Sequence, residues 1–159
     1  MGLEFSNNLE ELERIEKLKN KVFKYISFKK RTEKEVRDKF KDEIDEDLLD
    51  DIIEYMKEQK YIDDESYVDR FVKEIMALKS TSIKDITYKL MAKGISNNII
   101  DDYICKNRET MIEYELASVK KIYLKKKDRE EEQDIRNYLF KKGFLSDSIS
   151  DGIEEGKEE

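Results

Sequence analysis

The sequence predicts an all-α protein, an elongated tandem array of about three three-helix repeats with a period near 50 residues. Three observations lead to this prediction. The 159 residues include no proline, and 45% of them are charged, which favours long, solvated helices over buried strands. Apolar residues recur at steps of three and four along most of the chain, as they do on one face of an α-helix. Similar motifs also return about every 50 residues, which indicates stacked units.

The repeats are visible in the helix that comes second in each group of three. The matching positions are Thr32, Val36 and Phe40 in the first repeat, Ser82, Ile86 and Leu90 in the second, and Ile135 and Leu139 in the third. The first two sets are 50 residues apart, and the second and third are 49 apart. The expected organisation is an N-terminal extension with the start of the first helix (1–16), three repeats (17–62, 63–106 and 107–155) and an acidic tail (156–159).

The first helix is expected to begin at Asn8, because Asn8 and Glu11 have the spacing of a capping box. Leu9 opens an apolar stripe that continues at steps of three and four to Ile26. The helix is expected to end near Phe28, just before a cluster of cations that suits the negative end of a helix.

The next helices begin at residues that cap helix N-termini. Thr32 and Glu35 form a second capping box and open the second helix. The expected caps of the third to sixth helices are Asp45, Asp63 or Asp64, Ser82 and Ser96. Gly94 and Gly143 end the fifth and eighth helices, because glycine readily adopts the left-handed conformation of a helix terminus. A long seventh helix lies between residues 112 and 127, and a short ninth helix is centred on residues 149–153.

Composition excludes several classes of site. The chain contains no histidine, which removes most zinc sites and the Ser-His and Cys-His catalytic arrangements. Cys105, the single cysteine, cannot form an intramolecular disulfide and is expected to be a small, partly buried apolar residue. No apolar run approaches the roughly 18 residues that span a membrane. The protein is therefore expected to be cytoplasmic.

Adjacent carboxylates occur at residues 50–51, 63–64 and 101–102. Neighbouring residues on a helix point about 100° apart, so these pairs are expected to be solvated faces or helix caps rather than metal or acid–base sites. The five glycines are scattered and form no phosphate-binding loop. We expect no catalytic residue, no metal site and no cofactor, and the protein is not expected to be an enzyme.

Positive charge is concentrated in parts of an otherwise acidic chain. The net charge is −7, yet residues 17–41 contain eleven Lys and Arg against three Asp and Glu. Such clusters can contact DNA phosphates without reading sequence, or can contact an acidic partner surface. Alternatively, they only solubilise the C-terminal ends of helices. The candidate binding residues are Lys29, Lys30, Arg31, Lys120, Lys121, Lys125, Lys126 and Lys127.

Three motifs together resemble the RecX family, bacterial regulators of the RecA recombinase. They lie at residues 32–36, at 61–64 together with 67–68, and at 90–95, and the resemblance covers most of the chain. The residues that carry it are Thr32, Glu35, Tyr61, Asp63, Asp64, Tyr67, Lys93 and Gly94, together with Gly143, the repeat equivalent of Gly94. The chain departs from the family pattern at Val68, where alanine is usual, at residues 43–44, which replace a Lys-Gly step, and at Glu131, which replaces a Ser/Thr cap.

The resemblance implies a fold of tandem three-helix repeats and a function without catalysis. It implies a protein that binds in the groove of the RecA–DNA filament and restrains filament growth, ATP hydrolysis, strand exchange and co-protease activity, and with them recombination, DNA repair and the SOS response. It implies no cofactor. A monomer is expected from the closed pattern of the repeats, and no membrane contact is expected because no apolar run is long enough to span one. Two other hypotheses remain open: a direct binder of single- or double-stranded DNA with helix-turn-helix-like repeats, against which the net charge of −7 counts, and a helical scaffold for an unrelated partner.

Overall fold

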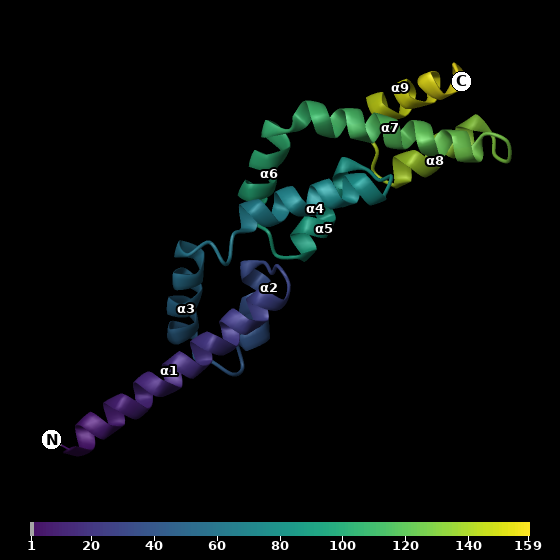
Figure 1. Ribbon diagram of the computed structural model, residues 1–159. Coiled ribbons are helices and arrows are strands. Elements are labelled where there is room, and N and C mark those ends of the chain that lie inside the picture. Colours follow the sequence, from purple (N-terminus) through teal and green to yellow (C-terminus); the bar gives the residue numbers. More distant parts are fainter. Residues whose placement is uncertain (1) are drawn as a thin grey trace. The chain divides into compact units, whose positions relative to one another are not determined.

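The structure, a computed structural model, describes the backbone of residues 2–159 and the side chains from Asn8 onward. Within that part of the chain it contains nine α-helices and no β-strand (Figure 1). The helices are α1 (Gly2–Phe28), α2 (Glu33–Phe40), α3 (Glu46–Glu58), α4 (Asp64–Leu78), α5 (Ile83–Ala92), α6 (Asn97–Lys106), α7 (Arg108–Lys126), α8 (Glu132–Lys141) and α9 (Ser146–Lys157). The predicted all-α class is confirmed, and the order of the helices is consistent with three groups of three.

The chain forms two compact units, Met1–Tyr67 and Val68–Glu159. The first unit contains α1, α2, α3 and the first turn of α4. Its core is one apolar cluster to which all three complete helices contribute. The buried members are Val22, Ile26, Val36, Phe40, Ile44, Leu49, Ile52, Ile53, Met56 and Ile62.

In the second unit, α7 and α9 lie side by side, with α8 against them (Figure 1). Their core consists of Val119, Tyr123, Ile135, Leu139, Phe144, Ile149 and Ile153. The long α7 has no continuous apolar stripe, because two of its buried residues, Glu115 and Ser118, are polar. Two glycines of α9, Gly152 and Gly156, are buried against α7.

Side-chain caps begin the second helix in the first two repeats. The hydroxyl of Thr32 accepts the amide of Glu35 at 3.1 Å, and the hydroxyl of Ser82 accepts the amide of Asp85 at 3.0 Å. In the third repeat Glu131 occupies the capping position and makes no side-chain cap. The predicted caps of α3, α4 and α6 are present at Asp45, Asp63 and Ser96.

Gly94 and Gly143 end α5 and α8 in the left-handed conformation, with φ of 85° and 91°. This confirms their predicted role as helix terminators. The first repeat completes the equivalent turn without glycine. There the amide of the buried Ile44 donates to the carbonyl of Phe40 at 2.9 Å, so the chain turns with one residue fewer.

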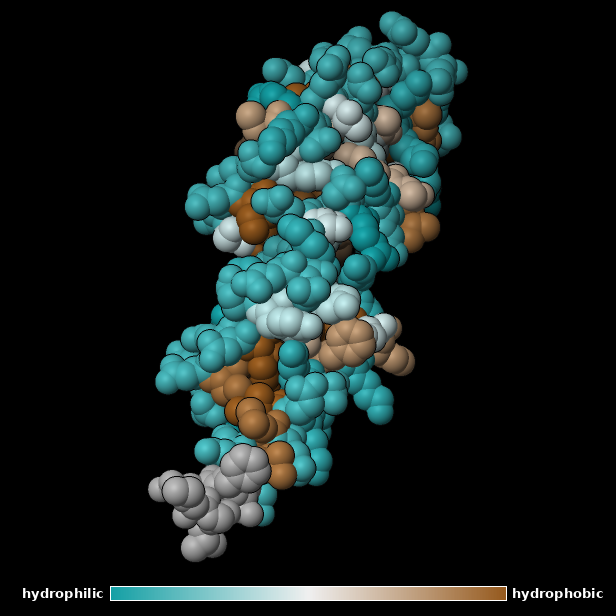
Figure 2. Space-filling view, turned by 60° about the vertical axis from the view of Figure 1, so that its left-hand side comes forward, coloured by the Kyte–Doolittle hydropathy of each residue, from teal (hydrophilic) through white to brown (hydrophobic). Residues whose placement is uncertain are grey.

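Two expectations from the sequence are wrong. Asn8 does not begin the first helix, because α1 starts at Gly2 and no proline interrupts the residues between them. After Asn8, α1 carries exposed apolar residues, Leu9 at 53% and Leu12 at 63% exposure, and Figure 2 shows hydrophobic surface toward this end of the helix.

The second expectation that is wrong concerns Cys105. It is exposed rather than partly buried, because it lies on the side of α6 roughly opposite the buried Ile100.

Candidate partner-binding surfaces

The cations that follow α1 divide into two kinds. Lys29 and Lys30 are exposed and form no ion pair with any described residue. Arg31 is engaged within the first unit, where its guanidinium lies 4.3 Å from the centre of the Tyr25 ring and 3.7 Å from the Glu35 carboxylate. Only the two lysines are therefore available to a partner, while Arg31 joins α1 to α2.

The cations near the end of α7 divide in the same way. Lys120 pairs with the carboxylate of Glu159 at 2.6 Å. Lys126 pairs with Glu130 at 3.0 Å and lies 4.1 Å from the centre of the Tyr138 ring. The other three candidate lysines of this cluster, Lys121, Lys125 and Lys127, are exposed and make no ion pair with any described residue.

A carboxylate contacts the first amide of the second helix in each of the first two repeats. In the first unit Asp64 accepts the amide of Glu33 at 3.0 Å. In the second unit Glu115 accepts the amide of Ile83 at 3.1 Å. Both carboxylates come from the first helix of the next group, α4 or α7, and they are 51 residues apart. They join neighbouring groups of helices by satisfying an amide that the helix itself leaves free.

Glu115 is fully buried and was missed by sequence reasoning. Its second carboxylate oxygen accepts the hydroxyl of Ser148 on α9 at 2.7 Å. One side chain of α7 therefore holds the starts of both α5 and α9. The repeat period was the signal that could have identified it, because Glu115 follows the family-motif residue Asp64 by 51 residues.

Burial raises the pKa of the Asp64 carboxyl, although the bond from the Glu33 amide and the charge of Lys57 oppose this rise. The unfolded chain releases this proton near the ordinary value of 3.8, whereas the folded protein retains it to higher pH. The contribution of Asp64 to stability therefore falls as pH rises from 3.8 to the raised pKa of the folded protein. It is least favourable at neutral pH, where the carboxylate is buried with its charge.

Asp64→Asn is accordingly expected to be more stable than the parent at neutral pH, because an amide oxygen still accepts the Glu33 amide and carries no charge to bury. The advantage is expected to shrink below pH 3.8, where the parent carboxyl is also neutral. Urea denaturation of both proteins at neutral and acid pH measures the difference. Asp101→Asn, at an exposed position of α6, is the control. A stability difference between Asp64→Asn and the parent that does not change with pH would contradict a raised pKa of Asp64.

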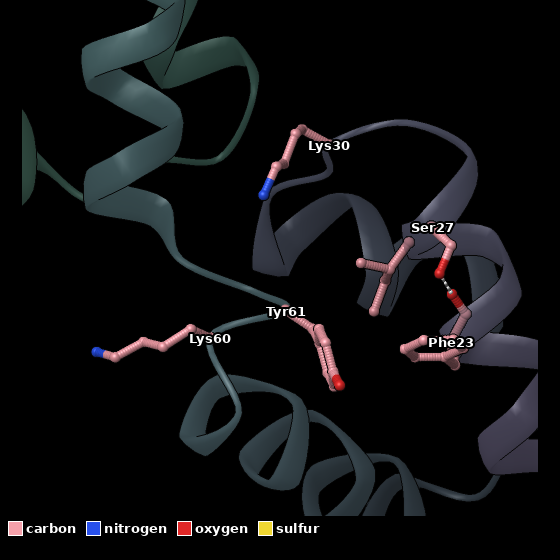
Figure 3. Close-up of a pocket in the computed structure, with 6 residues that line it drawn as sticks. Phe23, Ser27, Lys30, Lys60 and Tyr61 are labelled. Carbon is pink, nitrogen blue, oxygen red and sulfur yellow. Dashed lines mark hydrogen bonds between the residues drawn. The ribbon is translucent and has the colours of Figure 1, made fainter.

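A pocket of about 220 Å³ lies in the first unit, between the C-terminal half of α1 and the turn after α3 (Figure 3). The rings of Phe23 and Tyr61 meet edge to face there, with centroids 5.1 Å apart. They remain 41% and 42% exposed. The lining residues are Phe23, Ile26, Ser27, Lys30, Lys60 and Tyr61. The family-motif residue Tyr61 is thus part of a surface depression, and Lys30 is the one candidate cation that lines it.

Lys60 has a φ of 63° and is the one residue other than glycine with a positive φ in the described chain. This left-handed conformation costs a non-glycine residue about 1–2 kcal/mol. It lets α3 end in a tight turn in which the amide of Tyr61 reaches the carbonyl of Met56 at 2.8 Å. Its side chain extends away from the two rings into solvent (Figure 3). Neither Phe23 nor Lys60 was singled out from the sequence, because their proximity depends on how α1 packs on α3.

Among the described residues no group of three or more His, Cys, Asp or Glu side chains is placed to hold a metal ion. None of the helices described is both long and apolar enough to cross a membrane.

Comparison with known proteins finds close similarity over most of the chain. "Regulatory protein RecX" of Clostridium beijerinckii is 32% identical over 152 residues, which are 91% of this chain and 70% of that protein. The crystal structure of RecX from Lactobacillus salivarius matches with a TM-score of 0.79 and 27% identity, covering 93% of this chain and 99% of that one. A second crystal structure, of a regulatory protein RecX, matches with a TM-score of 0.79 and 25% identity, covering 96% and 76%. No family model matches the chain.

Proposed function

Because this chain belongs to the RecX family of regulatory proteins, we propose that it regulates the RecA recombinase by binding in the groove of the RecA–DNA filament. In this proposal it catalyses no reaction and carries no cofactor. It restrains filament growth, ATP hydrolysis, strand exchange and co-protease activity, and through them the SOS response. Acting on a DNA-bound partner, it works in the cytoplasm as a monomer.

The observation that supports the proposal is the match of nearly the whole chain, in sequence and in fold, to proteins named as RecX regulatory proteins. The repetition of the helices along the chain agrees with it physically. Repeated units present equivalent positions at regular intervals, and a filament presents equivalent protomers at regular intervals, so several weak contacts can add to one tight one. The exposed lysines without ion pairs supply charges that a filament of protein and DNA can meet.

The direct test is RecA-dependent ATP hydrolysis on single-stranded DNA, with this protein titrated in. We expect hydrolysis to fall at ratios well below one protein per RecA, because one bound molecule blocks growth of a longer filament. Lys125→Glu with Lys127→Glu is expected to weaken this inhibition roughly tenfold, as charge reversal at an interface turns attraction into repulsion. Lys17→Glu with Lys41→Glu changes the net charge equally at other exposed positions and is the control. Unchanged hydrolysis at excess protein would overturn the proposal.

Direct DNA binding is the second candidate function, and the exposed lysines after α1 and near the end of α7 favour it. Phosphate contacts of this kind are salt-dependent and independent of sequence. Binding of the isolated protein to single- and double-stranded DNA at near-physiological salt separates the two candidates. Tight binding there, without any effect on RecA, would make DNA the primary partner. Weak binding that disappears with salt agrees with the regulatory proposal.

A further inference from the structure

We propose that the pocket between α1 and the turn after α3 binds one nucleotide of a single-stranded nucleic acid. The base stacks on the exposed face of one ring of the Phe23–Tyr61 pair and meets the edge of the other, since the two rings stand at 78° to each other. The phosphates on either side of it contact Lys30 and Lys60, whose flexible side chain turns toward them on binding. This inference goes beyond regulation of the filament and does not depend on it, because the site belongs to this chain alone and can be tested without RecA.

The aromatic pair is the first reason. Two large rings that serve only the core would be expected to be buried, since burial of their apolar surface is what stabilises a fold. Phe23 and Tyr61 instead remain two-fifths exposed around a hollow, held against each other at 5.1 Å. Exposed rings in a depression are the usual means by which proteins bind unpaired bases, because every base has a face that stacks on an aromatic ring.

The charge of the pocket is the second reason. Its lining contains two lysines and no acidic residue, and neither lysine forms an ion pair within the described chain. Lys30 and the other α1 residues of the lining belong to the basic segment 17–41, and Lys60 is one of two lysines among the thirteen acidic side chains of residues 42–69. An acidic peptide would satisfy the lysines but would leave the rings uncovered. A nucleotide joins a planar ring to an anion within one unit and satisfies both.

The third reason is the position of Lys60. The turn after α3 adopts the left-handed conformation at this residue, where glycine would fit without strain. Lys60 lines the pocket, but its side chain extends away from the rings in the structure, so its long flexible stem has to turn back for the ammonium group to meet a phosphate at the rim. Residues under such conformational strain cluster at functional sites.

A similar pairing continues along the same two helices. Lys19 lies one turn before Phe23 on α1, and its ammonium is 3.7 Å from the centre of the Tyr55 ring on α3. A cation and a ring therefore also meet one turn earlier along α1 and α3, in a contact that the chain makes with itself.

Trp fluorescence offers a sharp test, because the chain contains no tryptophan. Phe23→Trp places a single reporter in the pocket, and Phe28→Trp places one at a site that is 87% exposed and does not line it. Oligo-dT of about 8 nucleotides, a length within the range that one small binding fold contacts, is expected to quench Phe23→Trp but not Phe28→Trp. Inorganic phosphate is expected to quench neither. Equal quenching of both reporters, or of neither, would overturn the proposal.

The lysines are tested by anisotropy of fluorescein-labelled oligo-dT with the otherwise unsubstituted protein. Lys30→Gln combined with Lys60→Gly removes both charges, and glycine relieves the left-handed turn, so the variant is expected to fold. We expect its Kd to rise about tenfold and the slope of log K against log salt to become shallower by about 1.4, or 0.7 for each lost phosphate contact. Lys29→Gln, the exposed neighbour outside the pocket, is the control and is expected to change Kd less than twofold.

Two other outcomes would reassign the pocket. Free dTMP that quenches Phe23→Trp at the same concentration as oligo-dT would make the ligand a mononucleotide and overturn binding of a strand. Unchanged oligo-dT affinity in the lysine variant, with weakened binding to RecA that is free of DNA, would make the pocket a protein-docking site. Failure of the RecA assay described above, with quenching intact, would overturn the regulatory proposal and leave this one standing.

Discussion

Glu115→Ala is expected to lower the free energy of unfolding of the second unit by about 3 kcal/mol. The substitution leaves two donors without acceptors, the part-buried amide of Ile83 at the start of α5 and the buried hydroxyl of Ser148 in α9. A hydrogen bond to a charged group contributes about 1.5–3 kcal/mol, and a buried donor left unpaired costs about 1–3 kcal/mol. Glu115→Ala therefore costs more stability than replacement of an ordinary surface glutamate by alanine. Urea denaturation followed by circular dichroism measures it.

Glu115→Gln separates the loss of acceptors from the loss of the side chain. Its amide oxygen can still accept the Ile83 amide, and its NH₂ group can donate to a rotated Ser148 hydroxyl. We expect this variant to lose less than half as much stability as the alanine variant. Glu113→Ala, at an exposed position of the same helix, is the control. Similar stabilities of Glu115→Ala and Glu113→Ala would show that the buried bridge does not stabilise the fold.

Gly152→Ala is expected to destabilise the protein by about 1–3 kcal/mol, although alanine favours helix formation over glycine by about 1 kcal/mol. A Cβ atom at this position would lie 2.6 Å from a methyl carbon of Val119 and 2.9 Å from the backbone carbonyl oxygen of Leu116. The oxygen belongs to α7 itself, so it can move away only if the two helices separate. Differential scanning calorimetry would show the loss as a lower Tm.

Two comparisons make this result specific to the contact between α7 and α9. Ser150→Ala changes an exposed position of the same helix and is expected to be neutral or slightly stabilising. Gly156→Ala is expected to cost less than Gly152→Ala, because its Cβ would meet only the side chain of Tyr123, at 2.6 Å, and a ring edge can shift. If Gly152→Ala were more stable than the parent, α9 would not lie as close to α7 as described.

The sequence identified a set of candidate binding cations, but it could not show which of them lie free on the surface. The eight cations were identified by their clustering, and three of them, Arg31, Lys120 and Lys126, prove to have acidic partners within their own unit. The partner of Lys120 is 39 residues away, at Glu159, so no local pattern could reveal it. The five cations that remain without partners are Lys29, Lys30, Lys121, Lys125 and Lys127.

The sequence by itself determined the helices and their repetition, because the interactions that specify them are local. A cap joins residues three apart, as Thr32 and Ser82 show, and a left-handed glycine ends a helix at its own position, as Gly94 and Gly143 show. The family motifs are made of these same local features. A local pattern also misled at Asn8, where a capping-box spacing lies inside a longer helix.

Only the tertiary structure decided which residues meet across the helices. Gly152 and Gly156 suggest a weak helix when the sequence is taken alone, yet their missing side chains are what lets α9 approach α7. Glu115 resembles any surface glutamate until two other helices bring donors to it. The pocket requires Phe23 and Tyr61, 38 residues apart, to lie edge to face. Each of these features depends on distances between segments far apart in the chain, and helical periodicity carries no information about such distances.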